Sequence, residues 1–375
     1  MPLSENDKLA RIRANSFTWL RTDWLLRMES VCGGAQAVLG RSARELSAEG
    51  GISEETAAQF LRESASCDPE GELKKSSSAG ARIIFLGEPG YPEALSEIPD
   101  PPVLLYVQGN ADFSKPAAAL VGTRLPTAYG RRVAARLARD LAGCGLAIAS
   151  GLARGIDSVV HEAALEAGGV TWAVIGTGLG RCYPSENREL ARDIAAKGGL
   201  VISEYPFDRG PMRHHFPRRN RIIAGLSQAT AVIEAPVTSG ALITAKLALE
   251  QGREVLAVPG PVDVPQSEGP NMLIKEGAGV LRAASDLLDA LPSKYMFGLA
   301  RDAASPAQGL RPAPPSAPLG EDEKAALALV DAGGITLDGM VERLGWPVPR
   351  AAAALFELET KTIITCLVGV YSRKL

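Results

Sequence analysis

The stretch Leu146-Ala-Ile-Ala-Ser-Gly-Leu-Ala-Arg-Gly-Ile-Asp157 decides the fold class of this chain. It joins a short, continuously apolar run to a glycine-rich turn, and a helical pattern follows at residues 157–167. Strands that are apolar on both faces are typical of a parallel sheet covered by helices on its two sides. The sequence therefore predicts a doubly wound α/β domain. Similar apolar runs, separated by helical patterns, lie at residues 118–121, 170–175, 200–203, 231–233 and 255–258.

Glycine-rich turns follow the carboxyl ends of four predicted strands. In an open parallel sheet, ligands bind outside these strand ends. Small residues let backbone N–H groups approach phosphate oxygens, and the helix N-termini that follow add a positive dipole. Arg124 lies among these turns, either as a phosphate ligand or as a turn residue paired with a nearby acid. The turns are Gly122-Thr-Arg124, Ser150-Gly-Leu-Ala-Arg-Gly-Ile-Asp157, Gly176-Thr-Gly-Leu-Gly180 and Ser239-Gly-Ala-Leu-Ile-Thr244.

A basic segment lies between Arg209 and Ile233. It contains five arginines (209, 213, 218, 219 and 221), two of the three histidines and no acidic residue, although the net charge of the chain is −3. Phe216 lies among these cations. Guanidinium groups for phosphates together with an aromatic ring for a base are what single-stranded nucleic acid requires. The alternative is that these arginines cover apolar surface or pair with acids elsewhere in the fold.

The motifs of the common nucleotide enzymes are missing from this sequence. No G-x-G-x-x-G follows the first core strand, no acid ends the second, and no G-x-x-x-x-G-K-[ST] is present. Asp157 and His161 are four residues apart on one predicted helix, a spacing that suits a structural contact better than a catalytic pair. Glu204 and Glu234 end strands, but no nucleophile accompanies them. We expect no catalytic residues and no cofactor.

Composition excludes several other classes of protein. Apolar residues make up 46% and charged residues 22% of the 375 residues, as in globular proteins. The five cysteines are scattered and the histidines are few, so we predict reduced thiols and no metal site. The polar amino-terminal residues do not resemble a signal peptide, and no apolar run is long enough for a membrane span. We expect a cytoplasmic protein without membrane contact.

The chain is predicted to have four parts. Residues 1–75 have helical spacing with a turn at Cys32-Gly-Gly34, which suits a helix-hairpin-helix that holds DNA or a plain helical bundle. Residues 71–80 look like a flexible connector. Residues 80–293 form the α/β domain and begin with short strands at 82–86 and 103–107, and residues 294–320 form a linker rich in proline and alanine.

Residues 321–375 have the outline of a winged helix, three helices and a hairpin. Because its third helix carries Glu357 and Glu359 against a single arginine, duplex binding is less expected there than packing or protein contact.

The α/β segment resembles the DNA-processing protein A family (DprA, also called Smf). The resemblance covers about residues 83–286. The motifs that carry it are Gly122-Thr-Arg124, Ser150-Gly-Leu-Ala-Arg-Gly-Ile-Asp157 with His161, Tyr183-Pro-Ser-Glu-Asn187, Ser203-Glu-Tyr-Pro206, Phe216-Pro-x-Arg-Asn-Arg-Ile-Ile-Ala-Gly-Leu-Ser227, Ser239-Gly-Ala-Leu-Ile-Thr-Ala245, Val258-Pro-Gly260 and Ser267-Glu-Gly-Pro-Asn271.

The resemblance implies an extended Rossmann-like domain that binds single-stranded DNA, forms a homodimer and loads the recombinase RecA onto incoming strands in natural transformation. The family is not known for an enzymatic activity, and its helical and winged-helix domains fit residues 1–75 and 321–375. Taken with the glycine turns and the basic segment, it implies nucleic-acid contacts at Gly122, Thr123, Arg124, Ser150, Gly151, Arg213, Phe216, Arg218, Asn220, Arg221, Ser239 and Gly240.

One rival function remains open, a nucleotide-processing enzyme of the phosphoribohydrolase type on a similar Rossmann-like fold. Such enzymes carry a Pro-Gly-Gly-x-Gly-Thr loop followed by a glutamate. The comparable place in this chain reads Thr238-Ser-Gly-Ala-Leu-Ile-Thr244 and lacks that acid.

Overall fold

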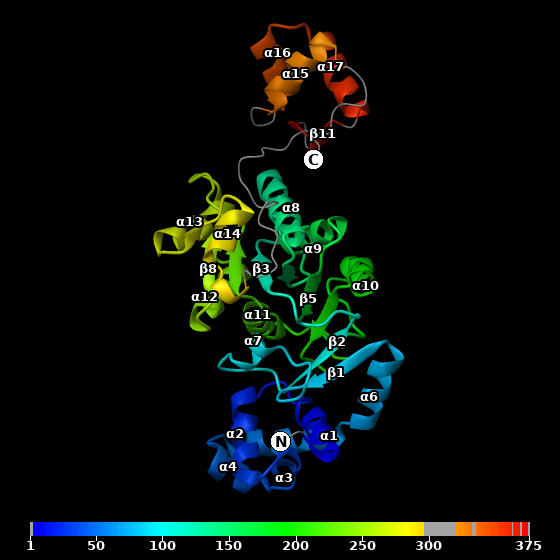
Figure 1. The fold of residues 1–375 in the computed structure, drawn as a ribbon, viewed down its shortest axis with the longest axis vertical. Coiled ribbons are helices and arrows are strands. Elements are labelled where there is room, and N and C mark those ends of the chain that lie inside the picture. Colours follow the sequence, from blue (N-terminus) through cyan, green and yellow to red (C-terminus); the bar gives the residue numbers. More distant parts are fainter. Residues whose placement is uncertain (1–2, 296–319, 332–334, 362, 368–369, 374–375) are drawn as a thin grey trace. The chain divides into compact units, whose positions relative to one another are not determined.

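The computed structural model of the chain describes residues 3–295, 320–331, 335–361, 363–367 and 370–373 (Figure 1). The chain divides into two compact units, Met1–Pro306 and Ala307–Leu375. The first unit holds a helical segment and an α/β domain, and the second holds a small helical domain with its own sheet. The linker predicted at residues 294–320 lies almost entirely outside the described residues.

A nine-stranded sheet forms the centre of the described part of the first unit. Its strands are β1 (Ala81–Phe85), β2 (Leu104–Gln108), β3 (Ala117–Val121), β4 (Ala147–Ser150), β5 (Thr171–Ile175), β6 (Leu200–Ser203), β7 (Ala229–Val232), β8 (Glu254–Ala257) and β9 (Gly279–Val280). They pair in the order β1-β2-β6-β5-β4-β3-β7-β8-β9. Neighbours are parallel from β6 to β9, whereas β2 is antiparallel to both β1 and β6. The predicted doubly wound, mainly parallel sheet is confirmed.

Helices cover both faces of this sheet (Figure 1). They are α7 (Glu93–Ser96), α8 (Ala128–Gly143), α9 (Ile156–Glu166), α10 (Arg188–Ala196), α11 (His215–Leu226), α12 (Gly240–Glu250), α13 (Pro265–Lys275) and α14 (Ala284–Ala290), with short 3-10 turns at Ser185–Asn187 and Ser293–Tyr295. Because side chains alternate along a strand, Ala118 and Leu120 of β3 pack with α8, α9 and α14. Ala117, Ala119 and Val121 pack with α11 and α12 on the other face. A strand buried on both sides has to be apolar throughout, which is why its sequence shows no alternation.

The amino-terminal helices pack onto the antiparallel edge of the sheet. They are α1 (Glu5–Ala14), α2 (Thr22–Cys32), α3 (Ala35–Leu39), α4 (Ala43–Gly50), α5 (Glu54–Ser66) and α6 (Pro69–Ser78). Trp24, Met28 and Phe60 from these helices share one hydrophobic core with Leu104 and Tyr106 of β2. The helical segment therefore continues the α/β domain as one packed body.

The flexible connector predicted at residues 71–80 is wrong, because α6 occupies most of it. The Asp68 carboxylate caps this helix by accepting a hydrogen bond from the Gly71 N–H (2.9 Å), and Pro69 occupies its first turn. The carboxylate of Glu72 accepts hydrogen bonds from the Tyr106 hydroxyl (3.2 Å) and from the Phe207 N–H (2.8 Å). These tertiary contacts outweigh the flexible composition.

The second unit has the predicted order of elements. Helices α15 (Glu321–Asp331), α16 (Leu337–Leu344) and α17 (Val348–Thr360) pack around a core that includes Met340 and Leu355. The strands β10 (Ile335–Thr336), β11 (Ile364–Leu367) and β12 (Val370–Arg373) form a sheet in the order β10-β12-β11. Within the described ranges, no helix is long and apolar enough to cross a membrane.

Two buried histidines make stability depend on pH. The His161 ring lies under the sheet with Nδ1 2.6 Å from the Thr171 hydroxyl, and burial lowers the pKa of His161 to about 3. Burial also lowers the pKa of His215 to about 4, and the neighbouring His214 acts in the same direction. Both rings are neutral in the folded protein at pH 6, whereas the unfolded chain takes up protons below about pH 6.5. The free energy of unfolding therefore falls as the pH falls from 6.5 towards these values.

We expect His161 to contribute up to about 1.4 kcal/mol per pH unit to this loss. Urea unfolding at pH values between 7.5 and 5 measures it, in a range above the titration of ordinary carboxylates. His161→Gln should give a shallower dependence on pH than the wild type, whatever its stability at pH 7.5. Identical slopes for the two proteins would contradict this assignment.

Candidate nucleic-acid interface

The strand order reverses between the parallel neighbours β3 and β7. From β3 the chain adds β4, β5 and β6 on one side, and from β7 it adds β8 and β9 on the other. In a doubly wound sheet the crevice outside the carboxyl ends of such a pair is the place where ligands bind. A groove of about 630 Å³ lies at this position. Its lining comes from the segments after β3, β4, β5 and β7, from the start of α11 and from the start of α12. This groove is the candidate site.

The glycine turns are held close together by backbone contacts. The Thr123 N–H donates to the Glu234 carbonyl (2.6 Å), and the Ile156 N–H donates to the Thr123 carbonyl (3.2 Å). Gly155 has φ +80, and a Cβ there would lie 2.4 Å from the Thr123 carbonyl oxygen. A Cβ on Gly151 would lie 2.7 Å from the nearest guanidinium nitrogen of Arg219. These two glycines let the turns after β3 and β4 meet at one edge.

Two exposed arginines, Arg124 and Arg213, line the groove. Within the described residues, no hydrogen bond or ion pair is formed by either guanidinium. Of the two possibilities for Arg124, the pairing with a nearby acid is therefore not seen. Two unpaired cations on one concave surface suit a ligand with more than one phosphate.

An aromatic pair adjoins these cations. The rings of Tyr183 and Phe216 are 5.5 Å apart between centroids at an angle of 53°. Both residues line the groove and the small cavity beside it, which also touches Arg124 and Gly151. The Phe216 ring packs closely against Gly176, since a Cβ added to this glycine would lie 2.9 Å from the ring. Tyr183 lines the groove but is absent from the predicted contact set, because its motif served only as part of the family resemblance.

The start of α12 forms the opposite wall. The Ser239 hydroxyl caps this helix by accepting a hydrogen bond from the Ala241 N–H (3.3 Å), and the Asn220 amide donates to the Gly240 carbonyl (3.3 Å). Thr238, Ile243 and Thr244 complete the wall. A capped helix N-terminus beside Arg124 and Arg213 increases the positive potential of the groove.

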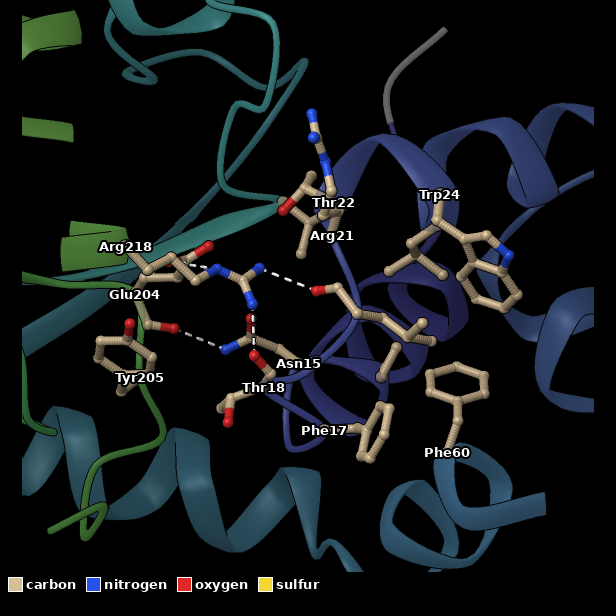
Figure 2. Close-up of a pocket in the computed structure, with 14 residues that line it drawn as sticks. Asn15, Phe17, Thr18, Arg21, Thr22, Trp24, Phe60, Glu204, Tyr205 and Arg218 are labelled. Atoms are coloured by element: carbon tan, nitrogen blue, oxygen red, sulfur yellow. Dashed lines mark hydrogen bonds and ion pairs between the residues drawn. The ribbon is translucent and has the colours of Figure 1, made fainter. Parts of the chain in front are cut away.

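Two arginines of the basic segment, Arg209 and Arg218, bind the amino-terminal helical segment and not the groove. Arg209 donates to the Ser16 carbonyl (2.6 Å), and Arg218 donates to the carbonyls of Thr18 and Leu20. Figure 2 shows the Arg218 guanidinium between the α/β domain and the turn after α1, near Asn15, whose amide donates to the Glu204 carbonyl (2.7 Å). These contacts attach the amino-terminal helices to the α/β domain.

Arg221 is also occupied away from the groove. Its Nη2 and Nη1 donate to the two Glu204 carboxylate oxygens at 2.5 and 2.9 Å, and its Nε donates to the Asp100 carbonyl at 2.8 Å. The pair is buried, with 5% of Arg221 and 4% of Glu204 exposed. Burial alone would raise the pKa of Glu204, but the charges of Arg221 and Arg218 lower it.

Three residues of the predicted contact set are therefore corrected. Arg218 and Arg221 do not line the groove, because Glu204, Asp100 and the carbonyls of the amino-terminal helices occupy their guanidinium groups. Ser150 is fully buried, and its hydroxyl donates to the Leu120 carbonyl (2.7 Å). The groove does bring together the other predicted residues, which are Gly122, Thr123, Arg124, Arg213, Phe216, Asn220, Ser239 and Gly240, with Gly151 in the small cavity beside it.

Arg219 stabilises the floor of the groove from within. Its guanidinium donates to the carbonyls of Gly151 (2.7 Å) and Val174. Burial lowers the pKa of Arg219 to about 10. The nearby Asp157 carboxylate accepts hydrogen bonds from the N–H groups of Gly151 (3.1 Å) and Ala153 (3.3 Å), and burial raises the pKa of Asp157. Because Asp157 bonds to the backbone and His161 bonds to Thr171, the structure shows no Asp157–His161 hydrogen bond.

The two strand-end glutamates are engaged as well. Glu204 is in the ion pair with Arg221, and the Glu234 carboxylate accepts hydrogen bonds from the N–H (2.8 Å) and hydroxyl (2.5 Å) of Thr127. The Thr127 hydroxyl in turn caps α8 by accepting from the Gly130 N–H (3.1 Å). Both carboxylates therefore act as structural acceptors in this conformation.

Comparisons with known proteins agree with this architecture. Residues 82–292 match the family model of DNA recombination-mediator protein A, and residues 311–369 match that of the DprA winged helix domain. Protein Smf of Escherichia coli (strain K12) is 40% identical over 291 residues, which cover 76% of this chain and 75% of that protein.

Among the solved structures similar to the chain are two of DNA processing protein A. The X-ray structure of DNA processing protein A from Streptococcus pneumoniae superimposes with a TM-score of 0.65 at 33% identity, covering 78% of this chain and 99% of that one. A structure of DNA processing protein A from Helicobacter pylori, described for its single-stranded DNA binding mode, gives a TM-score of 0.50 at 31% identity, covering 56% of this chain and 94% of that one.

The resemblance inferred from the motifs between Gly122 and Asn271 is thus confirmed over the α/β domain and is extended by the second unit. The similarity to Smf spans three quarters of both proteins. This chain belongs to the DNA recombination-mediator protein A family, also called DprA or Smf, and residues 311–369 are its winged helix domain.

Proposed function

We propose that the protein binds single-stranded DNA in the groove and serves as a recombination mediator during DNA processing. The observation that carries this proposal is the combination, on one surface, of two unpaired guanidinium groups, Arg124 and Arg213, with the aromatic pair Tyr183 and Phe216. The cations suit backbone phosphates, and the rings suit unstacked bases of any sequence. The binding mode named for the Helicobacter pylori relative supports the same reading.

A single strand fits this surface better than a duplex does. Bases in a duplex are stacked on one another and present only their edges to a protein. An aromatic ring can stack on a base only when that base is separated from its neighbours, as in a single strand. The helices α11 and α12, which line the groove, are packed against the sheet, α11 through Ile222 and Ile223 and α12 through Ala241 and Ala245, so neither is free to enter a major groove.

The same contacts argue against a nucleotide-processing enzyme. The enzyme alternative requires a strand-end carboxylate that is free to activate water near a bound nucleotide. Glu204 is paired with Arg221, Glu234 accepts two hydrogen bonds from Thr127, and Asp157 accepts two from backbone N–H groups. We therefore propose a binding protein without a catalytic residue.

Membership of the family supports three finer proposals, namely loading of RecA onto the bound strand, assembly as a homodimer and a cytoplasmic location. Two protomers on one strand would raise the apparent affinity through effective concentration. Light scattering of the purified chain tests the dimer. RecA filament formation on strands coated with a single-strand-binding protein, with and without this chain, tests loading.

Fluorescence anisotropy of labelled oligo-dT and of a matching duplex, titrated with salt, tests the central proposal. We expect preferential binding of the single strand and a linear decrease of log affinity with log salt. Arg124→Ala should weaken binding and reduce the magnitude of the salt slope by roughly 0.7, the value for one lost phosphate contact on a single strand. Lys197→Ala, which removes an exposed cation paired with Asp193 on α10, is the matched control and should leave the slope unchanged.

Equal affinity for duplex and single strand, or an unchanged slope for Arg124→Ala, would contradict the proposed site. Release of free base from nucleoside monophosphates by the purified protein would favour the phosphoribohydrolase alternative instead.

A further inference from the structure

An exposed tryptophan of the amino-terminal helical segment is stacked on His214, the residue that follows the groove-lining Arg213 in the chain. Trp19, in the turn between α1 and α2, has 60% of its surface exposed. One face of its indole is stacked on the His214 ring at 4.2 Å between centroids and 26° between planes. The other large aromatic side chains of this segment, among them Trp24 and Phe60, are buried in its core.

The indole is held in place from both sides along the chain. Arg218 donates to the carbonyls of Thr18 and Leu20, the residues immediately before and after Trp19. The Thr18 hydroxyl lies 3.4 Å from Nε2 of His215. Arg218 therefore fixes the backbone on both sides of Trp19 and so limits the movement of the exposed indole.

The indole is supported by a series of ring contacts, two stacked and one edge-to-face. His214 meets His215 edge-to-face at 4.6 Å, and His215 is stacked on the buried Tyr205 at 3.9 Å. His214, moreover, follows Arg213 directly, and neighbouring Cα atoms are about 3.8 Å apart. The residue that supports Trp19 is thus adjacent in the chain to one that lines the groove, and Phe216 lies two positions further on.

We propose that the bound single strand leaves the groove past Arg213 and stacks a base on Trp19, so that the amino-terminal helical segment forms part of the strand-binding surface. This inference rests on the proposed function of the groove. A tryptophan with one face fixed on another ring and the remaining surface in solvent offers a flat platform to any base. The exposed charge of Arg213, the residue before His214, suits the phosphate that precedes such a base.

Binding of oligo-dT of about 4 to 16 nucleotides, the range of known single-strand site sizes, distinguishes stacking on Tyr183 and Phe216 in the groove from stacking on Trp19. For the shortest oligonucleotides that the wild type binds, Trp19→Ala should have the same affinity as the wild type. It should bind longer ones roughly 5- to 150-fold more weakly, the effect of one lost stacking contact. Trp19→Phe should keep most of the affinity, and Val31→Ala, which truncates another exposed apolar side chain of the same segment, should match the wild type.

Tryptophan fluorescence gives a second readout that does not depend on affinity. Stacking of a base on Trp19 should quench the emission of the wild type, and Trp19→Phe should lose this quenching while it still binds. Trp24 and Trp172 are buried and serve as an internal reference. This variant keeps an aromatic ring on His214, so it tests the inference even if Trp19→Ala fails to fold.

The outcomes separate this inference from the proposed function. Normal oligo-dT binding that is sensitive to Arg124→Ala, but with the length dependence and quenching unaltered by changes at Trp19, would overturn the extended path and leave the groove intact. Failure of the wild type to bind oligo-dT of any length would overturn both.

Discussion

Arg221→Met is expected to lower the free energy of unfolding by about 3–5 kcal/mol, the cost of breaking a buried ion pair by removing one partner. The change leaves the Glu204 carboxylate buried without the two hydrogen bonds, at 2.5 and 2.9 Å, that now satisfy it. Since burial raises the pKa of Glu204 and the Arg221 charge opposes that effect, the variant should take up a proton at this carboxyl. A loss of this size is a large part of the 5–15 kcal/mol that stabilises a typical domain.

Urea unfolding of Arg221→Met measures the effect, and two further variants show its cause. Glu204→Leu combined with Arg221→Met removes both members of the pair and should recover part of the lost stability, because the buried Glu204 charge is gone, whereas Asp100 still lacks its contact with Arg221 (3.1 Å). Lys197→Ala, which breaks the exposed pair with Asp193, should change stability little. If Arg221→Met is as stable as the wild type, the buried pair of Arg221 and Glu204 does not contribute to the stability of the α/β domain.

Phe216→Ala is expected to weaken binding of oligo-dT by about 1–3 kcal/mol, the usual value for one stacked base. The slope of log affinity against log salt should stay at the wild-type value, because no phosphate contact is removed. This combination distinguishes the ring from Arg124 and Arg213, whose removal changes both quantities. Anisotropy titrations at several salt concentrations measure both for each variant.

Two substitutions at the same position serve as controls. Phe216→Tyr retains a π-face and should bind nearly as the wild type does. Phe216→Leu keeps apolar contact with Gly176 but lacks the ring, so it should resemble Phe216→Ala if stacking on a base is the cause. A leucine variant with wild-type affinity would show that the side chain only packs against the turn after β5.

The pattern of strands and helices could be predicted from the sequence because burial on both faces requires apolar residues at every position of a strand. The run at residues 146–149 and the strand Ala147–Ser150 differ by one residue. The direction of β2 could not be predicted, because strands 103–107 and 118–121 look alike in composition although one pairs antiparallel to its neighbours. Direction depends on the partner strand and not on the strand's own residues.

Much of the site was predictable for a different reason. Gly122, Arg124 and Ser239 follow strands whose carboxyl ends meet at one edge, and the switch between β3 and β7 brings them together. The basic segment was only partly understood, since local composition does not show which carbonyls or acids lie opposite a guanidinium. Asp100, Thr18 and Leu20 are far from Arg218 and Arg221 in the sequence, and only the fold places them in contact.

Photocrosslinking of oligo-dT that carries 5-iododeoxyuridine, followed by mapping of the labelled peptides, tests the central claim most directly. Peptides that contain Tyr183 or Phe216 should be labelled, and this labelling should be lost in the double variant Arg124→Ala with Arg213→Ala. Crosslinks confined to residues 321–375, with the groove unlabelled, would contradict the assignment of the strand-binding site to the carboxyl edge of the sheet.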